Sequence, residues 1–482
     1  MKKEELFEAM EDIDPQSVEK AREYTVRKRP AWRGFAVLAA CAAVIVAAIW
    51  GIPAITNNNN GGSDMNTIPG LLTVNASYPE PVAGKLSAEE FMTGDEHWNW
   101  WSAYREQTST TQGLQKGMEA YNTSLMSKLL PSENENTVCS PLNTYIAFAM
   151  LAEVSEGNTR RQILDLLGVS DIETLRTNVS ALWKSNYVDT PVLKSLLANS
   201  VWLNNSVQYH DDTLNTLADT YYASSFSGTP GSEQMDEALR EWTDANTGGL
   251  LSEYTKHMSL DPDTVLEILS TIYYKAMWID EFHEDNNTRE IFHGTAGDRE
   301  IDMMHQTDTK AVYSSEHFTS LSLNLSDSGA MYFFLPKEGT DVNALVCDPD
   351  IMNALNYVEA GDNWSFPLVH LSVPKFKVSC KTDLIEAVRE LGVKDALDPT
   401  LSDFSPLTSE RDDLYLSKAE HAALIEIDEH GVTGAAYTEL AVAAGAAMPE
   451  DEIDFILDRP FMFIVTGNDG SILFSGVVRN ID

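Results

Sequence analysis

The sequence has little positive charge. Its 482 residues include 33 lysines and arginines against 74 aspartates and glutamates, which gives a formal net charge of −41 at pH 7. Residues 1–33 contain equal numbers of basic and acidic side chains, so the whole excess of negative charge lies beyond them. A surface of this charge repels nucleic acid and anionic membrane surfaces, and we expect neither as a partner of the globular part.

Cysteine and the common catalytic motifs are also scarce or missing. The four cysteines are scattered, with no close pair that would indicate a zinc site or a disulfide framework: Cys41, Cys139, Cys347 and Cys380. The sequence lacks a Gly-x-Ser-x-Gly elbow, a His-Glu-x-x-His pair, a phosphate loop and a dinucleotide fingerprint. We therefore expect no enzyme, no metal and no cofactor. A hydrolase triad assembled in space from distant Ser and His residues is the alternative that sequence leaves open.

The N-terminal region combines a polar segment with an uncharged run. Residues 1–33 read as a short polar helical segment, and residues 34–55 are 22 residues without a charge, long enough to span a bilayer as one transmembrane helix. Four basic residues stand just before the run: Arg27, Lys28, Arg29 and Arg33. No basic residue follows it until Lys85, so the positive-inside rule predicts a cytoplasmic segment 1–33 and an extracellular remainder.

A cleaved lipoprotein signal is the alternative for this region, because Leu38–Cys41 matches a lipoprotein cleavage box. The run stays apolar well beyond Cys41, where a lipoprotein would continue with a polar linker, so we expect an uncleaved anchor. Residues 56–84, with their Asn, Gly and Pro residues, are expected to be an extracellular linker. Residues 85–482 form the predicted globular domain, and they open with an acidic, Trp-rich lead-in that we expect to be helical.

A long stretch of small residues lies near the C-terminus. Val432–Ala447 contains no Lys or Arg and one acid, and it stands between strand-like segments. Alternate residues of this stretch fall into two sets. The first set, which begins at Val432, would suit a buried sheet face: Val432, Gly434, Ala436, Thr438, Leu440 and Val442. The second set carries the bulky and charged residues: Thr433, Ala435, Tyr437, Glu439, Ala441 and Ala443. The pattern predicts a loop able to enter a sheet as a strand.

Two motifs flank this stretch: Glu429–Ala436 at its start, and Asp458–Phe463 with Leu473–Asn480 after it. The first resembles the hinge of the reactive-centre loop of serpins, the loop-inserting protease inhibitors, and the second resembles the C-terminal signature of that family. The hinge residues that match are Glu429, Gly431, Val432, Thr433, Gly434, Ala435 and Ala436. Val432 stands where Thr is usual and Gly434 where Ala is usual. Neither adds bulk or charge to the inward face, so neither argues against insertion.

Further matches run in family order from about residue 116 over roughly 365 residues. They are Ser140–Leu142, Glu156–Leu164, Ala198–Leu203, Ile272–Trp278, Met303–Met304, Met331–Pro336, Val373–Lys377 and Ser417–Ala422. Each alone is typical of core packing, but their order is specific. The resemblance implies an α+β fold of the multi-domain class: about nine helices around three β-sheets, with an exposed reactive-centre loop, here preceded by the transmembrane helix.

The resemblance also places two groups of residues in the central sheet. The shutter, a polar cluster beneath the point where the sheet opens, would comprise Ser140, Asn143, Asn199, Ser270 and His421. The family usually has Ser at the Asn143 position and Asn at the Ser270 position. An exchange of this kind would keep one amide and one hydroxyl in the same hydrogen-bond network. Trp278 matches the breach tryptophan at the top of the sheet, where insertion begins.

The function implied is that of a suicide-substrate inhibitor of extracellular serine proteases, a monomeric, membrane-anchored member of bacterial type. The protease forms an acyl-enzyme ester with the loop, whose freed N-terminal side then inserts as a new central strand. Counting seventeen residues from Glu429 puts the scissile bond at Gly445–Ala446, within a window from Ala443 to Met448. The small side chains there suit elastase-like or subtilisin-like proteases and argue against trypsin-like ones.

Two other functions remain open at this point. A non-inhibitory serpin used as a carrier or binding scaffold would typically carry bulky, charged or Pro residues in the hinge, and Val432–Thr438 has none facing inward. A membrane-anchored adhesion or sensing protein would be favoured by a basic, coiled or phosphorylatable tail. Residues 1–33 are a short segment with balanced charge and show none of these features.

Overall fold

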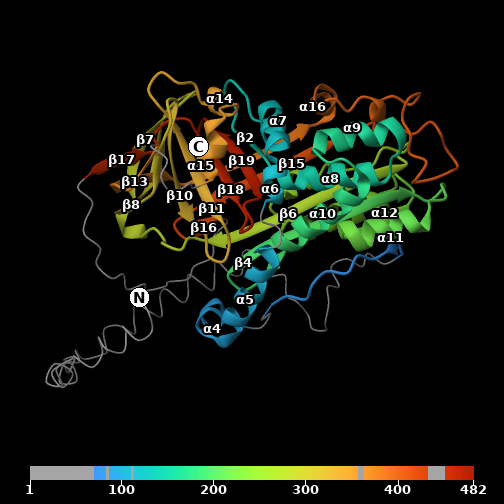
Figure 1. Cartoon of the computed structure of the whole chain (residues 1–482), viewed down its shortest axis with the longest axis horizontal. Coiled ribbons are helices and arrows are strands. Elements are labelled where there is room, and N and C mark those ends of the chain that lie inside the picture. Colours follow the sequence, from blue (N-terminus) through green and yellow to red (C-terminus); the bar gives the residue numbers. More distant parts are fainter. Residues whose placement is uncertain (1–69, 83–85, 110–112, 357–362, 433–450, 482) are drawn as a thin grey trace. The chain divides into compact units, whose positions relative to one another are not determined.

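The computed structural model describes residues 70–82, 86–109, 113–356, 363–432 and 451–481 (Figure 1). The predicted cytoplasmic segment, the transmembrane helix 34–55, Cys41, Thr433–Ala436 and the Gly445–Ala446 bond lie outside the described residues. Within them, no helix is both long and apolar enough to cross a membrane. The described residues belong to a compact unit that runs from Gly62 to Asp482.

The described residues of this unit form three β-sheets, as the resemblance implied. The first has eight strands, in the order β1 (Leu72–Val74), β5 (Ala223–Gly228), β4 (Leu193–Asn204), β6 (Leu266–Met277), β16 (Gly431–Val432), β15 (Glu420–Ile427) and β14 (Phe376–Asp383), with β3 (Val188–Asp189) beside β4. The second has seven, in the order β12 (Trp364–Ser365), β9 (Val312–Ser314), β10 (Phe318–Asn324), β11 (Ala330–Pro336), β18 (Phe461–Thr466), β19 (Ile472–Val478) and β2 (Thr137–Cys139). The third has four, in the order β17 (Glu452–Ile456), β13 (Leu368–Pro374), β8 (Gly297–Thr309) and β7 (Thr288–Gly294).

The described helices exceed the expected nine because several are single turns. The longer ones are α5 (Asp95–Ser109), α7 (Glu119–Leu129), α8 (Pro141–Glu153), α9 (Gly157–Leu167), α10 (Ile172–Asn186), α11 (Asp211–Tyr221) and α12 (Glu233–Asn246). The short ones are α4 (Ala88–Thr93), α6 (Leu114–Gly117), α13 (Ser252–Thr255), α14 (Val342–Leu345), α15 (Asp350–Leu355) and α16 (Ile385–Glu390), with 3-10 turns η2 (Glu284–Asn286) and η3 (Asp395–Leu397). Figure 1 shows α8 to α12 gathered along the first sheet, with the four-stranded sheet at the other end.

Helices cover the first sheet on both faces. On one face lies α8, which begins at Pro141, a residue suited to the first helical position, and whose side chains are almost all buried in the main core. On the other face, a second core forms where Trp242 of α12 packs against Trp202 of β4, with ring centroids 6.5 Å apart. Phe226 of β5 stacks on the same Trp202 at 4.5 Å. The sheet that would receive the loop is therefore built into the protein interior.

The N-terminal lead-in packs on the domain. Phe91 of α4 is fully buried against Val192 and Met277, at the ends of β4 and β6, and the predicted helical lead-in is present as α4 and α5. Within the predicted linker, β1 pairs with β5 and Leu71 is buried. This part of the linker is therefore an edge strand of the first sheet. Its apolar side chains contact the second core, and composition alone did not predict this contact.

Candidate functional site: a hinge above an open slot

A tight turn leads from β15 into the hinge. The Asp428 carboxylate Oδ1 accepts hydrogen bonds from the backbone N–H groups of His430 (2.9 Å) and Gly431 (3.2 Å). The Asp428 N–H in turn donates to the Gly431 carbonyl at 3.1 Å. An aspartate that bonds the backbone two and three residues ahead is a common turn former, so the sequence itself reverses the chain here. The reversal sends the hinge back along the sheet.

The Glu429 side chain links this turn to two connecting segments elsewhere in the chain. Its side chain is buried, and Oε1 accepts a hydrogen bond from Lys375 Nζ at 2.5 Å and another from Asn287 Nδ2. Burial acts to raise the pKa of Glu429, but these hydrogen bonds outweigh it, so the pKa lies below its ordinary value. Glu429 is thus held as a carboxylate at neutral pH. Sequence analysis identified the Val373–Lys377 motif but not its role as a partner of the hinge.

Trp278 lies directly against the turn. Its indole Nε1 donates to the Asp428 carbonyl at 2.9 Å, and its backbone N–H donates to the His430 carbonyl at 3.0 Å. The Phe282 N–H donates to the Glu429 carbonyl, also at 3.0 Å. The turn thus has its backbone carbonyls satisfied by the segment that follows β6. The predicted breach residue is therefore a direct support of the hinge, and Phe282 is a support that the sequence did not point to.

The hinge forms a two-residue strand between the two central strands. Gly431 and Val432 of β16 pair with Met277 and Ala276 of β6, and Val432 also pairs with Ile427 of β15. Val432 is fully buried, as expected for the first residue of the inward set. A side chain at Gly431 would collide with the Ala276 carbonyl oxygen and approach the Met277 Cα to 2.8 Å. Only glycine lets β16 lie this close to β6.

We expect Gly431→Ala to displace β16 from the sheet. The added methyl group meets backbone atoms, which cannot move aside as a flexible side chain can, and the cost should be about 1–3 kcal/mol. Amide hydrogen exchange at Val432 should accelerate tenfold or more, because the strand loses both neighbours. Gly434→Ala, at a position where the family usually has alanine, is the matched control. Equal exchange in the wild type and the Gly431 variant would contradict this packing.

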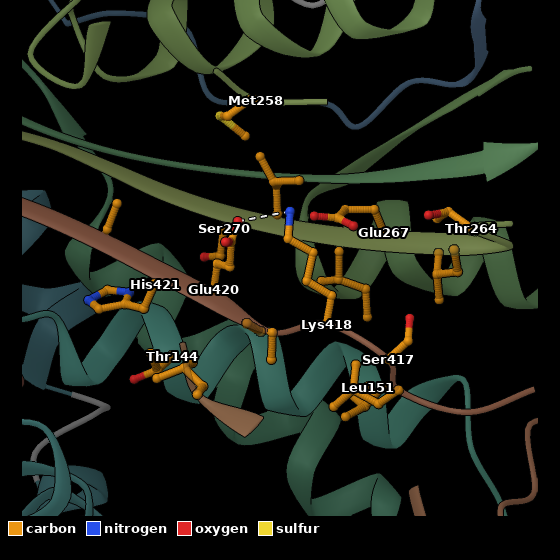
Figure 2. Close-up of a pocket in the computed structure, with 18 of the residues that line it drawn as sticks. Thr144, Leu151, Met258, Thr264, Glu267, Ser270, Ser417, Lys418, Glu420 and His421 are labelled. Carbon is orange, nitrogen blue, oxygen red and sulfur yellow. Dashed lines mark ion pairs between the residues drawn. The ribbon is translucent and has the colours of Figure 1, made fainter. Parts of the chain in front are cut away.

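Below β16, the sheet formed by the described residues is open. Among the described residues, β6 and β15 are joined in the sheet only through β16. A cavity of about 970 Å³ lies between them, lined by residues Leu266–Ile272 of β6 and by residues His421–Leu424 of β15. Figure 2 shows residues of both strands that line this slot, including Ser270 and His421. Within the described part of the chain, the edges of β6 and β15 that face the slot are unpaired below β16, so an added strand could pair with both.

Three of the five predicted shutter residues line the slot: Asn143, Ser270 and His421. The Ser270 hydroxyl donates to Asn143 Oδ1 at 2.8 Å, while Asn143 Nδ2 donates to the Ser270 carbonyl at 2.9 Å. The exchanged amide and hydroxyl therefore bond to each other across α8 and β6. Buried Ser140 and His421 form a second pair, in which the Ser140 N–H donates to His421 Nε2 at 2.9 Å. Asn199 is opposite Ser270 in the sheet, but its amide donates to the Tyr221 carbonyl at 2.7 Å.

Burial lowers the pKa of His421 from its ordinary value to about 4. Because the folded state favours neutral His421, this stabilisation is complete above about pH 6.5 and is lost as pH falls toward about 4. The shift corresponds to about 3 kcal/mol. We therefore expect the urea midpoint of the wild type to fall more steeply over this window than that of His421→Gln, in which an amide oxygen replaces Nε2. Identical pH slopes would show that His421 titrates without this penalty.

The fold and this site together define a class: a three-sheet protein whose loop hinge enters the head of an open central sheet. A family model described as "Serpin (serine protease inhibitor)" matches residues 117–481. The chain therefore belongs to the serpin family.

Its relatives are distant in sequence but similar over most of their length. Serpin-ZX of Arabidopsis thaliana is 27% identical over 367 residues, which cover 72% of this chain and 92% of the relative. Serpin B9 of Homo sapiens is 28% identical over 368 residues, covering 72% and 94%. The thermophilic serpin tengpin in its native state superposes with a TM-score of 0.67 at 23% identity, covering 76% of this chain and 93% of tengpin. The last comparison bears on the fold alone.

Proposed function

We propose that this protein is an irreversible suicide-substrate inhibitor of serine proteases outside the cell, and that it acts as an inhibitor rather than as an enzyme. The observation that carries the proposal is β16. Its two residues pair with β6 on one side, Val432 pairs with β15 on the other, and the unpaired slot lies directly below. A loop cleaved near Gly445 would be free to continue in this register.

The free energy that traps the protease comes from insertion of the cleaved loop into the slot. Fifteen residues from Gly431 to Gly445, at about 3.3 Å each, span roughly 50 Å, the long dimension of a small domain. Inserting them would pair both strand edges and bury the small apolar face of the loop. The native state is then a kinetic trap that cleavage of the loop releases. A covalently attached protease would be carried along the sheet.

The loop composition favours a particular class of target. Val442–Ala447 offers only small side chains, which fit the shallow pockets of elastase-like and subtilisin-like proteases. Incubation of the full chain with pancreatic elastase should produce an SDS-stable adduct and a C-terminal fragment that starts within Ala444–Met448. Elastase with a blocked catalytic serine is the control and should form no adduct. Loop cleavage by active elastase without any adduct would instead favour a non-inhibitory binding or adhesion protein.

We further propose that the inhibitor is monomeric and is held at the cell membrane by residues 34–55, with residues 1–33 in the cytoplasm. The proposal rests on the uncharged run and on the basic residues before it. Protease added to whole cells should remove the domain beyond Thr56 and leave residues 1–33 protected. Recovery of a mature chain that begins at a lipid-modified Cys41 would show that the protein is a lipoprotein and that residues 34–55 are not an uncleaved anchor.

A further inference from the structure

The helical lead-in lies outside the part of the chain that the serpin family model matches. That match begins at residue 117, whereas α4 and α5 lie between Ala88 and Ser109. A capping box fixes the start of α4: the Glu90 N–H donates to the Ser87 hydroxyl at 3.2 Å, and the Ser87 N–H donates to the Glu90 carboxylate at 2.9 Å. Membership of the family therefore assigns no role to this helix pair.

Phe91 of α4 joins the lead-in to the strand that the hinge pairs with. Its side chain is fully buried in a small apolar cluster with Val192 and Met277, and the ring of Trp100 from α5 packs on it with centroids 6.0 Å apart. Met277 is the residue of β6 that pairs with Gly431 of β16. The lead-in therefore contacts the same β6 residue whose backbone pairs with the hinge.

His97 of α5 supports the same residue by a second route. Its ring Nε2 lies 2.9 Å from both carboxylate oxygens of Asp327, and both side chains are largely buried. Asp327 belongs to the turn between β10 and β11, in which the Ser326 N–H donates to the Met277 carbonyl at 2.8 Å. Met277 is thus held through its side chain by Phe91 and through its carbonyl by a turn that His97 contacts.

The second half of α5 is anchored independently, on α10. The Tyr104 hydroxyl donates to the Ser185 carbonyl at 2.8 Å, and the Gln107 amide donates to the Lys184 carbonyl at 2.7 Å. Tyr104 is buried and stacks on Trp100 with ring centroids 5.0 Å apart. Because a helix is stiff over a few turns, a helix fixed at this end supports the side chains at its other end.

We propose that α4 and α5 form a clamp that positions the hinge for insertion, with Phe91 and His97 as its positioning residues; the role in insertion rests on the proposed function. In the described part of the chain, β16 has two residues, so few strand pairs hold it in the sheet. Such a short strand stays paired only while its partner keeps its place. The clamp meets this requirement at Met277, the partner of Gly431.

Release of the clamp should slow insertion without changing the loop itself. Insertion starts from molecules in which β16 is already paired, so a paired fraction about tenfold smaller gives insertion about tenfold slower. Hydrolysis of the acyl-enzyme does not depend on that fraction, so the ratio of trapped to released protease should fall by the same factor. The clamp would thus set how much of the cleaved inhibitor traps its protease.

Amide hydrogen exchange on the full chain tests the clamp without any protease. Phe91→Ala should accelerate exchange at Val432 at least about tenfold, while exchange at Phe463, in β18 of the second sheet, should not change. His97→Ala removes the other contact and leaves the apolar cluster intact, so it should act in the same direction even if Phe91→Ala fails to fold. Phe91→Leu, which keeps a large apolar side chain, should restore most of the protection. Trp98→Ala is the matched control and should change nothing, because Trp98 lies on α5 with 71% of its surface exposed.

Two results of this measurement would overturn the clamp. The first is unchanged exchange at Val432 in both Phe91→Ala and His97→Ala, and the second is an equal rise at Phe463, which would indicate general destabilisation. In the Gly431→Ala background, where β16 is already displaced, Phe91→Ala should add no further acceleration at Val432. A full additional effect there would mean that Phe91 does not act through β16.

A second assay, with elastase, tests the role in insertion. Phe91→Ala and His97→Ala should be cleaved at the wild-type rate and at the same bond, but the ratio of SDS-stable adduct to cleaved free inhibitor should fall about tenfold. Trp98→Ala should keep the wild-type ratio. Faster exchange at Val432 with an unchanged ratio would contradict the positioning role. Absence of adduct in every sample, the wild type included, would count against the proposed function and not against the clamp.

Discussion

Replacing Ala436 with arginine is expected to convert the protein from an inhibitor into a substrate. Val432 pairs with Ala276 and with Ile427, and each further step of an antiparallel strand moves both partners by one. Ala436 would therefore arrive between Ile272 of β6 and Ala423 of β15. Because Ala423 and Ile427 are buried on the inward face of β15, the introduced guanidinium would enter the core without a partner.

The kinetic consequence follows from the size of this cost. An unpaired buried cation costs at least several kcal/mol, and each ~1.4 kcal/mol added to the insertion barrier slows insertion about tenfold. Hydrolysis of the acyl-enzyme should then be faster than insertion of the loop. The Ala436→Arg variant should be cleaved at the same bond as the wild type and release active protease. Gel analysis of the adduct and titration of the recovered protease activity measure both outcomes.

Ala435→Arg is the matched control for this experiment. In the same register, Ala435 would lie between Tyr273 and Leu424, on the opposite face of the sheet, where Glu426 of β15 is a diagonal neighbour. A long, flexible arginine side chain can reach solvent or Glu426 from there. Most of the inhibition should therefore remain. Equal loss at both positions, or loss at neither, would mean that the loop does not insert in the register of β16.

Gly445→Arg should redirect the inhibitor toward trypsin-like proteases. Such enzymes carry an acidic primary pocket that requires Lys or Arg, and the wild-type window Ala443–Met448 supplies neither. The rate of adduct formation with trypsin should rise at least about a hundredfold, and that with elastase should fall. N-terminal sequencing of the released fragment identifies the cleaved bond. Efficient trapping of trypsin by the unaltered protein, at another bond of the loop, would show that the scissile bond is misplaced.

Much of the architecture could be predicted from the resemblance to serpins, because the order of its motifs along the chain is specific. The resemblance implied three sheets, which the described residues form, and the structure places Trp278 beside the hinge. The burial of Val432 also agrees with the period-two pattern. The shutter could be predicted in part. Asn143 and Ser270 do bond to each other, whereas Asn199 donates to the backbone of Tyr221 instead.

The remaining features depend on segments that are far apart in sequence. Glu429 is buried against Lys375 and Asn287, which lie in two connecting segments distant in sequence, and no local pattern identifies those partners. Likewise, Leu72–Val74 is a strand only because the exposed edge of β5 accepts it. Whether a polar group is buried and which group it pairs with depend on the surrounding protein. The sequence next to a residue therefore does not predict either property.

By itself, the sequence showed a hinge motif that resembles that of the serpins, a loop of small residues able to enter a sheet, and an uncharged run near its N-terminus. The first rests on the resemblance, whereas the other two follow from side-chain size, charge and periodicity, which neighbouring residues carry on their own. Only the tertiary structure decided that, among the described residues, the slot below β16 is open and that His421 is held neutral in the shutter. Each of these features depends on residues that are distant in sequence and that folding brings together around the slot. Those residues set the free-energy cost of removing a polar side chain from water.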